Sequence, residues 1–204
     1  MIRASSLSLK RGEREILRNF DVEIQGHKTL AIIGPNGSGK SSLISALVGD
    51  LVATHGTVTI DEKPLADYSR GELAKIRSVA SQHQRFSLAY RVEEVLTMSI
   101  SYSGDAESIS RSVDALDIQD LLPRKVTSLS GGEQQRVSIA MALSQRSKYL
   151  FLDEPFSAQD VESTERITSH LQELAAEGRA IVIVAHVPQS ELSWCDQIIK
   201  LKKI

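Results

Sequence analysis

Residues 30–41 read LAIIGPNGSGKS and give the clearest indication of the fold class. The first four residues are a continuous apolar run, which is typical of a parallel strand covered on both faces. Glycines follow at once, and residues 41–48 then have the pattern of a helix that ends at Gly49. The order of strand, glycine-rich loop and helix predicts an α/β protein built around this loop.

Strand and helix patterns alternate along the rest of the chain, which favours the same fold class. Apolar or alternating runs predict strands at residues 20–24, 57–60, 78–81, 149–152 and 180–185. Capping boxes predict helices that begin after Ser69 and Ser130, and a further helix is expected over residues 161–177. From about residue 84 to residue 123 helical spacing replaces the strand signals. We therefore expect one domain over residues 1–204, with an α/β core (1–83 and 124–204) and an inserted helical subdomain (84–123).

The composition excludes several classes of protein. With 41% apolar and 25% charged residues, the chain is typical of a globular protein and not of a disordered one. Only 4% of the residues are aromatic and the net charge is −2, so the composition does not favour a nucleic-acid partner. The one cysteine, Cys195, cannot form an internal disulfide, which favours a cytosolic protein. The N-terminus does not resemble a signal peptide, and runs such as residues 180–185 cover about a third of a membrane span.

The glycine-rich loop predicts a nucleotide site, because residues 34–41 match the pattern G-x-x-x-x-G-K-[ST]. Glycines let backbone N–H groups converge on phosphate oxygens. Lys40 would place its charge on the β- and γ-phosphates, and the Ser41 hydroxyl would ligate Mg²⁺. A glycine-rich turn with an incidental lysine is the alternative, but it does not explain the preceding strand and the following helix. The residues expected to bind the nucleotide are Gly34, Pro35, Asn36, Gly37, Ser38, Gly39, Lys40, Ser41 and Ser42.

The strand at residues 149–152 ends in two carboxylates. Asp153 would reach the Mg²⁺ shell, directly or through water, and Glu154 would orient or deprotonate the attacking water. Acidic pairs at strand ends are common in α/β proteins, so this prediction depends on the phosphate loop.

Residues 129–136 read LSGGEQQR, a motif that is typical of one protein family. Ser130 and two glycines at a helix start form a second cradle of backbone N–H groups for an anion. A capped helix start would account for Ser130 and Glu133, but not for their occurrence with the two preceding motifs. With these motifs in order, nearly the whole chain resembles the ATP-binding-cassette (ABC) ATPases. This resemblance implies a P-loop core with an N-terminal antiparallel β subdomain and an inserted α-helical subdomain.

The resemblance also implies roles for single residues. Gln82 corresponds to the glutamine that contacts Mg²⁺ and water, and His186 to the histidine that contacts the γ-phosphate. Without the other motifs, Gln82 would be interpreted as an ordinary surface residue and His186 as a structural one. Residues 157–160 correspond to the segment that crosses the dimer interface, with Gln159 where the family usually has leucine. The residues implied to grip the nucleotide of a second copy are Ser130, Gly131, Gly132, Gln134 and Asp160, and those implied to bind the metal are Ser41, Gln82 and Asp153.

Arg11 departs from the family pattern. It precedes Gly12 in the first hairpin, where the family often stacks an aromatic ring on adenine. An arginine plane also stacks on a base, so we expect Arg11 to contact the nucleotide. The alternative is that Lys10 and Arg11 are solvated charges of the turn.

The resemblance implies one half of a motor that works at the cytoplasmic face of the cell membrane, peripherally bound to permease subunits. Two copies would close around two Mg-ATP. Residues 85–98, including Phe86, Leu88 and Tyr90, are expected to line the groove that receives the permease, although packing within the helical subdomain explains them equally well.

Residues 72–83 and 92–95 look most like the importer ATPases for iron-siderophores, haem and cobalamin, which use an external binding protein. The alternatives are a compact exporter ATPase of the haem-exporter type and an ABC ATPase that acts on ribosomes or DNA. The latter usually carry a second cassette or long coiled coils, and neither pattern occurs here. A cassette that binds ATP without hydrolysing it is disfavoured, because Lys40, Glu154 and His186 are all present.

Overall fold

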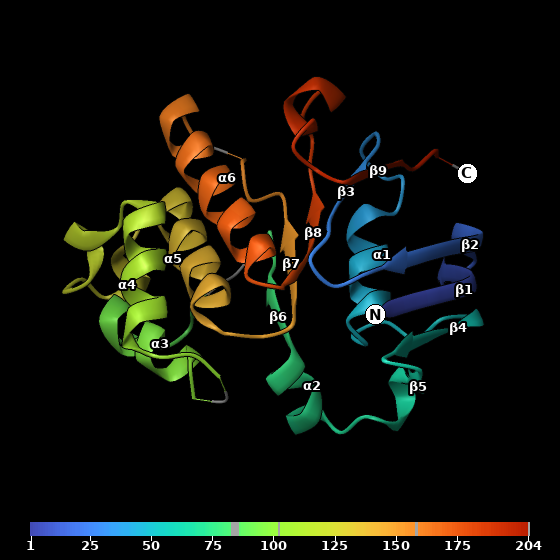
Figure 1. The fold of residues 1–204 in the computed structure, drawn as a ribbon, viewed down its shortest axis with the longest axis horizontal. Helices are drawn as coiled ribbons and strands as arrows, with labels where there is room; N and C mark the ends of the chain where they lie inside the picture. The colour runs from blue at the N-terminus through green and yellow to red at the C-terminus, as the bar shows by residue number, and fades with distance from the viewer. Residues whose placement is uncertain (83–85, 102, 158, 204) are drawn as a thin grey trace.

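The computed structural model describes residues 1–82, 86–101, 103–157 and 159–203, which form two sheets and a group of helices (Figure 1). The antiparallel sheet has the strand order β2-β1-β4-β5, and the parallel sheet has the order β6-β7-β8-β3-β9. The strands are β1 (Ile2–Arg11), β2 (Arg14–Ile24), β3 (Thr29–Ile33), β4 (His55–Ile60), β5 (Lys63–Pro64), β6 (Arg77–Ala80), β7 (Tyr149–Asp153), β8 (Ala180–Val184) and β9 (Gln197–Lys200). The α-helices are α1 (Lys40–Leu47), α2 (Arg70–Ile76), α3 (Val92–Ser99), α4 (Ala106–Leu116), α5 (Gly131–Ser144) and α6 (Val161–Ala176). Short 3₁₀ turns are η1 (Leu65–Asp67), η2 (Gln119–Leu121), η3 (Val126–Ser128) and η4 (Gln189–Leu192).

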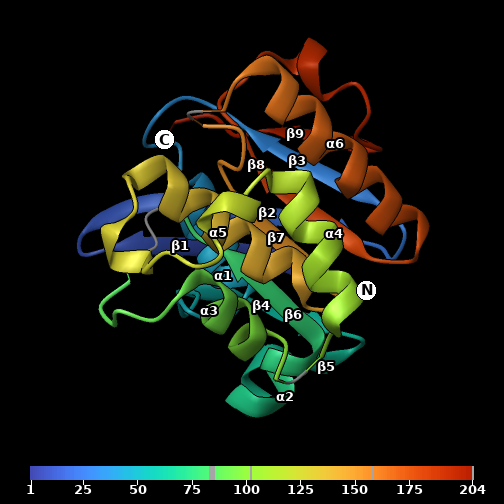
Figure 2. The same cartoon turned by 90° about the vertical axis from the view of Figure 1, so that its left-hand side faces the viewer.

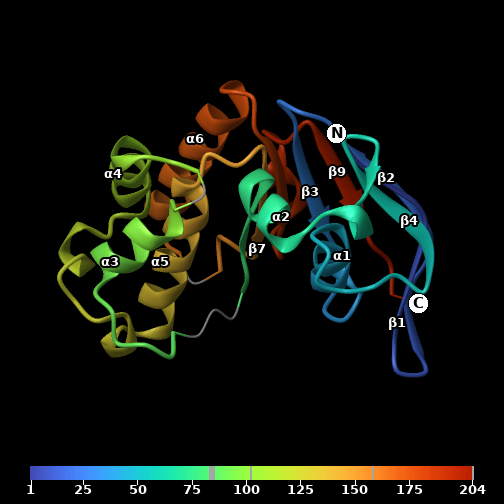
Figure 3. The same cartoon turned by 90° about the horizontal axis from the view of Figure 1, so that it is seen from below.

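The parallel sheet is the middle layer of the molecule. Along β3, Leu30 and Ile32 pack with α1 and the antiparallel sheet, whereas Ala31 and Ile33 pack with the helices on the other face. Because both faces are covered, every residue of β3 is buried and the strand has no polar alternation. Figure 3 shows the same order from below, with the antiparallel sheet on one side and α3, α4 and α5 on the other.

The parallel strands place the predicted site residues at one edge. Strands β6, β7, β8 and β3 run in the same direction, so their carboxyl ends meet on the same side of the sheet. The phosphate loop follows β3, Glu154 follows β7, and His186 comes just after β8. Gln82 follows β6 in the same way. Four loops that lie far apart in the sequence therefore meet at the carboxyl edge of the parallel sheet.

The helices α3, α4 and α5 form a group in which α5 packs against both of the others (Figure 2). Both predicted capping boxes are confirmed: the Ser69 hydroxyl accepts a hydrogen bond from the Glu72 N–H, and the Ser130 hydroxyl accepts one from the Glu133 N–H. Within the ranges described above, no helix has the length and apolar character that crossing a bilayer requires.

The predicted strands and helices are present; most ends lie within a few residues of the expected ranges, but β2 begins at Arg14, six residues before the predicted run. Strand β6 begins and ends one residue before the predicted run, and α1 begins at Lys40. The apolar and alternating runs given above do not include β1, β5 or β9. Of these, β9 pairs with β3 at the edge of the parallel sheet. Its side chains are half-buried or exposed, so it lacks the continuous apolar run that marks the central strands.

Candidate nucleotide-binding site

A cavity of about 520 Å³ lies at the carboxyl edge of the parallel sheet. Its lining combines the phosphate loop with residues that follow β6, β7 and β8. The lining residues are Asn36, Gly37, Gly39, Lys40, Ser41, Ser42, Gln82, Glu154 and His186. The three residues implied to be catalytic thus share one cavity with the loop, although Gln82 and His186 are more than a hundred residues apart.

The phosphate loop requires glycine at its tightest point. Gly39 has φ +95°, in the left-handed region, and a Cβ atom there would lie 2.6 Å from Cγ2 of Ile16 on β2. Gly39 directly precedes α1 and, as the N-cap residue, has no side chain with which to cap this helix start. The first backbone N–H groups of α1 are therefore left for an anion, as in other phosphate-binding helix starts.

Two polar groups of the loop fit a triphosphate. The Ser38 hydroxyl is buried and has no hydrogen-bond partner among the residues that the structure describes. Lys40 is 6% exposed, and its ammonium donates to the carbonyls of Gly34 at 2.9 Å and Pro35 at 3.3 Å. A buried hydroxyl without a partner is costly, and phosphate oxygens would satisfy both it and the ammonium group.

The carboxylate of Glu154 faces Gln82. The Gln82 Nε2 donates to Glu154 Oε2, and both residues are half-buried. Glu154 is itself in the left-handed region, with φ +57°, and its N–H donates to the carbonyl of Val184 at 2.8 Å. Directly before it, Asp153 is the last residue of β7, at the same edge of the sheet as Ser41 and Gln82. His186 is exposed and its Nε2 contacts Oδ1 of Asn36, so it lies against the phosphate loop.

The signature residues do not line this cavity. Ser130 and Gly131 are exposed at the start of α5, where the hydrogen bonds from Ser130 lower the pKa of Glu133. Gln134 donates to the carbonyls of Val126 and Leu129 within its own segment. A single chain therefore presents the phosphate loop in one place and the signature turn in another.

Asp160 caps α6. Its carboxylate accepts a hydrogen bond from the Ser163 N–H at 2.7 Å, which lowers its pKa. Ala158, in the segment expected to cross a dimer interface, lies outside the described residues, while Gln159 is half-buried.

Arg11 stands apart from the cavity. It is exposed at the end of β1, opposite Arg14, and does not line the site in this structure.

In the expected permease groove, Leu88 and Tyr90 are 62% and 43% exposed, whereas Phe86 packs against the core. Phe86 therefore fits the alternative interpretation, in which it packs within the helical subdomain. Arg85 lies outside the described residues.

Two residues that contact Gly39 or Glu154 are not among the site residues predicted from the sequence. Ile16 packs over Gly39, and Gln135 donates to the carbonyl of Glu154 at 2.9 Å and to the Ser157 hydroxyl at 2.8 Å. Gln135 lies within the LSGGEQQR motif, which is the one signal that could have drawn attention to it. Ile16 has no sequence signal, because its contact depends on how β2 crosses the loop.

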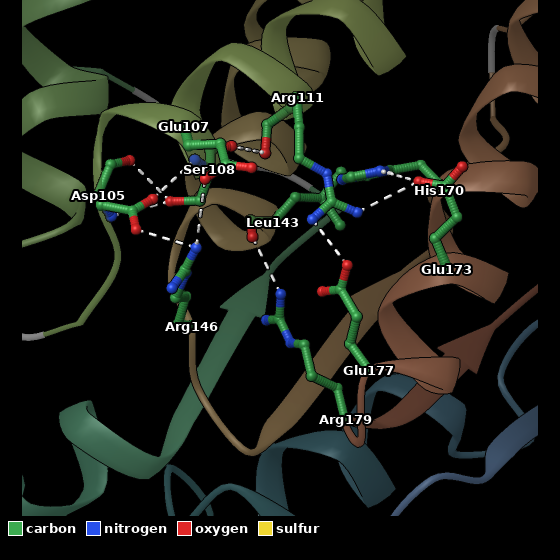
Figure 4. A network of polar contacts seen from close by, with 11 residues as sticks. Asp105, Glu107, Ser108, Arg111, Leu143, Arg146, His170, Glu173, Glu177 and Arg179 are labelled. Atoms are coloured by element: carbon green, nitrogen blue, oxygen red, sulfur yellow. Dashed lines mark hydrogen bonds and ion pairs between the residues drawn. The ribbon is translucent and has the colours of Figure 1, made fainter.

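A second cavity, of about 440 Å³, lies between α4, α5 and α6 (Figure 4). Arg111 pairs there with Glu177 at 2.7 Å, and Arg146 pairs with Asp105 at 2.9 Å. Arg179 is buried, which lowers its pKa to about 10, and it donates to the carbonyl of Leu143. Since acidic and basic groups neutralise one another here, this cavity does not favour a polyphosphate.

Comparisons with known proteins identify the family that this chain resembles. The family model described as "ABC transporter" matches residues 17–157. The hemin import ATP-binding protein HmuV of Streptomyces coelicolor is 34% identical over 98% of this chain and 74% of its own. The HmuV protein of Pseudomonas putida is 33% identical over 100% of this chain and 84% of its own.

Solved structures show the same architecture. The dimeric structure of a bacterial ABC transporter cassette has a TM-score of 0.83 and 29% identity, covering 99% of this chain and 94% of that one. An ATP-binding subunit of an ABC transporter has a TM-score of 0.88, covering 98% of this chain and 85% of that one, and at 21% identity it supports the fold alone. The chain therefore belongs to the ABC transporter family, as an ATP-binding domain that hydrolyses ATP.

Proposed function

We propose that this chain is the ATPase subunit of an importer for haem or a related iron chelate or cobalamin. In this proposal two copies close around two Mg-ATP and drive a membrane permease. One observation carries the proposal: Lys40, Gln82, Glu154 and His186 meet in one cavity, while the signature turn at Ser130 opens elsewhere. A second copy supplies the missing half of the site.

The chain's own groups bind the triphosphate. Backbone N–H groups at the start of α1 and the Ser38 hydroxyl donate to phosphate oxygens, and Lys40 exchanges its carbonyl partners for the β- and γ-phosphates. Ser41, Gln82 and Asp153 would hold Mg²⁺, which would neutralise charge on the phosphates.

Glu154 acts as the general base. Its carboxylate accepts a proton from the water that attacks the γ-phosphorus, while the bond from that phosphorus to the ADP oxygen breaks. The Gln82 Nε2 donates to this carboxylate and orients it at the cavity. His186, next to Asn36, contacts the γ-phosphate and reports its loss.

The signature turn grips the γ-phosphate bound to the partner copy. Ser130 and Gly131 are exposed, as a surface that meets a second copy must be. Because α5 begins there, its N-terminal N–H groups add a second cradle for the anion. Hydrolysis removes the shared phosphate, and the two copies then separate.

The importer assignment rests on the relatives. HmuV proteins of several bacteria are 31–34% identical over nearly the whole chain, and their name assigns them to hemin import. Leu88, Tyr90 and Met98 are exposed apolar side chains in or before α3 and would bind a short segment of the permease at the cytoplasmic face of the membrane. A binding protein outside the cell would deliver the cargo.

The test combines two variants of the full chain. Glu154→Gln should bind ATP normally, lower turnover at least about 100-fold and shift the protein from monomer to dimer when ATP is added. Ser130→Arg should block both hydrolysis and dimer formation while leaving ATP binding by the monomer intact. Size-exclusion chromatography with light scattering, a phosphate-release assay and nucleotide titration measure these effects. Full turnover in dilute monomers would contradict the composite site, and normal haem uptake by cells lacking the chain would contradict the cargo.

A further inference from the structure

Gln135 connects the signature helix to the catalytic segment. It lies on the second turn of α5, five residues after Ser130, and its side chain is half-buried. Its Nε2 donates to the main-chain carbonyl of Glu154 at 2.9 Å and to the Ser157 hydroxyl at 2.8 Å. The Ser157 hydroxyl in turn donates to the same carbonyl at 2.9 Å. The Ser157 N–H also donates to this carbonyl, at 3.2 Å, so the Glu154 carbonyl is held by three donors.

The backbone of Glu154 needs such support. Its φ of +57° lies in the left-handed region, which is unfavourable for a residue with a Cβ atom. Strained conformations of this kind persist only where the surroundings hold them firmly. The N–H of Glu154 is bound to Val184 at 2.8 Å, and its carbonyl is bound to Gln135 and Ser157. Both ends of the residue are thus clamped while the carboxylate reaches into the cavity.

We propose that Gln135 is a positioning residue, which holds the left-handed backbone of Glu154 so that its carboxylate stays aimed at the attacking water. The inference rests on the proposed role of Glu154 as general base. Because Ser130 caps α5 and Gln135 lies on its second turn, movement of the signature turn on the partner's nucleotide also moves the contact that holds this chain's own base. Gln135 thereby couples the two composite sites.

Neighbouring glutamines show that this contact is particular to Gln135. Gln134 turns toward the carbonyls of Val126 and Leu129. Gln145, at the other end of α5, donates to the carbonyl of Met141 in its own helix. Gln145 therefore offers a matched control, because the same substitution there leaves the catalytic segment untouched.

The first experiment replaces Gln135 with methionine, which has a similar volume but no donor. For the full chain, we expect Gln135→Met to lower kcat roughly 10- to 100-fold, as small displacements of catalytic groups do. The Kd for ATP should stay within about twofold, because Gln135 does not line the cavity. Gln145→Met should change neither value. If Gln135→Met fails to fold by circular dichroism, Ser157→Ala is tested instead. It removes the other side-chain donor to the same carbonyl and should likewise lower kcat.

A double-mutant cycle separates positioning from a structural role. Single-turnover hydrolysis is measured for Glu154→Gln and for Glu154→Gln combined with Gln135→Met. If Gln135 acts through the carboxylate of Glu154, adding Gln135→Met to that background should cost less than about twofold. If Gln135→Met lowers the hydrolysis rate by the same factor in the Glu154→Gln background as in the wild type, the inference is overturned.

The two hypotheses fail in different ways. Wild-type turnover in Glu154→Gln overturns the proposed function itself. Slow turnover in Glu154→Gln, together with normal kcat in Gln135→Met, overturns the positioning role and leaves the proposed function standing.

Discussion

Gly39→Ala adds a methyl group where β2 crosses the phosphate loop. The new Cβ would lie 2.6 Å from Ile16 Cγ2, closer than carbon atoms approach in folded proteins. The left-handed conformation, φ +95°, costs a further 1–2 kcal/mol for alanine, by order of magnitude. Alanine also lowers the entropy of the unfolded chain, which offsets roughly 0.4–1 kcal/mol of this loss.

Gly37→Ala is the matched comparison within the same loop. Gly37 also has a left-handed φ, +76°, but a Cβ there would meet nothing within 4 Å. The conformational and unfolded-state effects are therefore similar in the two variants and cancel in their difference. What remains is the steric clash, which we expect to make Gly39→Ala less stable than Gly37→Ala by about 1–3 kcal/mol.

Urea denaturation without nucleotide, followed by circular dichroism, measures the free energy of unfolding of each variant. When Ile16→Ala is added to both variants, the difference in stability between Gly37→Ala and Gly39→Ala should largely disappear. The reason is that Ile16→Ala removes the atom that clashes with the new Cβ. Equal stability of Gly37→Ala and Gly39→Ala, or no recovery with Ile16→Ala, would show that β2 does not constrain the loop as described.

Two further predictions concern binding and acid stability. Lys40→Ala should weaken ATP binding at least about tenfold in a nucleotide titration, because a charged hydrogen bond to phosphate is lost, and an unchanged Kd would contradict the site. For Asp61, burial alone would raise the pKa, but hydrogen bonds from Lys148, Met1 and Tyr149 lower it from 3.8 to about 2. Its stabilising effect is thus present above pH 4 and is lost as the pH falls toward 2. The melting temperatures of wild type and Asp61→Asn should therefore converge over that range, and a constant gap would exclude this linkage.

Local sequence patterns were sufficient for most of the fold. The apolar runs at β3, β7 and β8 identified the buried strands, because a strand covered on both faces contains few polar residues. Ser69 and Ser130 marked helix starts through capping boxes that the structure contains. Strand β9 has no such apolar run, because its edge position leaves it half exposed.

The candidate site depended on different kinds of information. The phosphate loop is continuous in sequence, so residues 34–42 could be predicted from one motif. Gln82 and His186 were placed through resemblance to a family, since a lone glutamine or histidine has no local signature. The structure brings both to the cavity, while their catalytic roles stay predictions.

Local residue patterns were enough to indicate most of the strands and helices and the phosphate loop, because backbone preference and burial depend largely on neighbouring residues. Which distant side chains meet depends instead on three-dimensional packing. Two contacts join segments that are distant in the chain: Gln135 binds the carbonyl of Glu154, and Ile16 lies against Gly39. The first of them holds the left-handed backbone of Glu154. Such contacts arise from the packing of α5 and β2 against the sheet, and no local pattern of residues encodes that geometry.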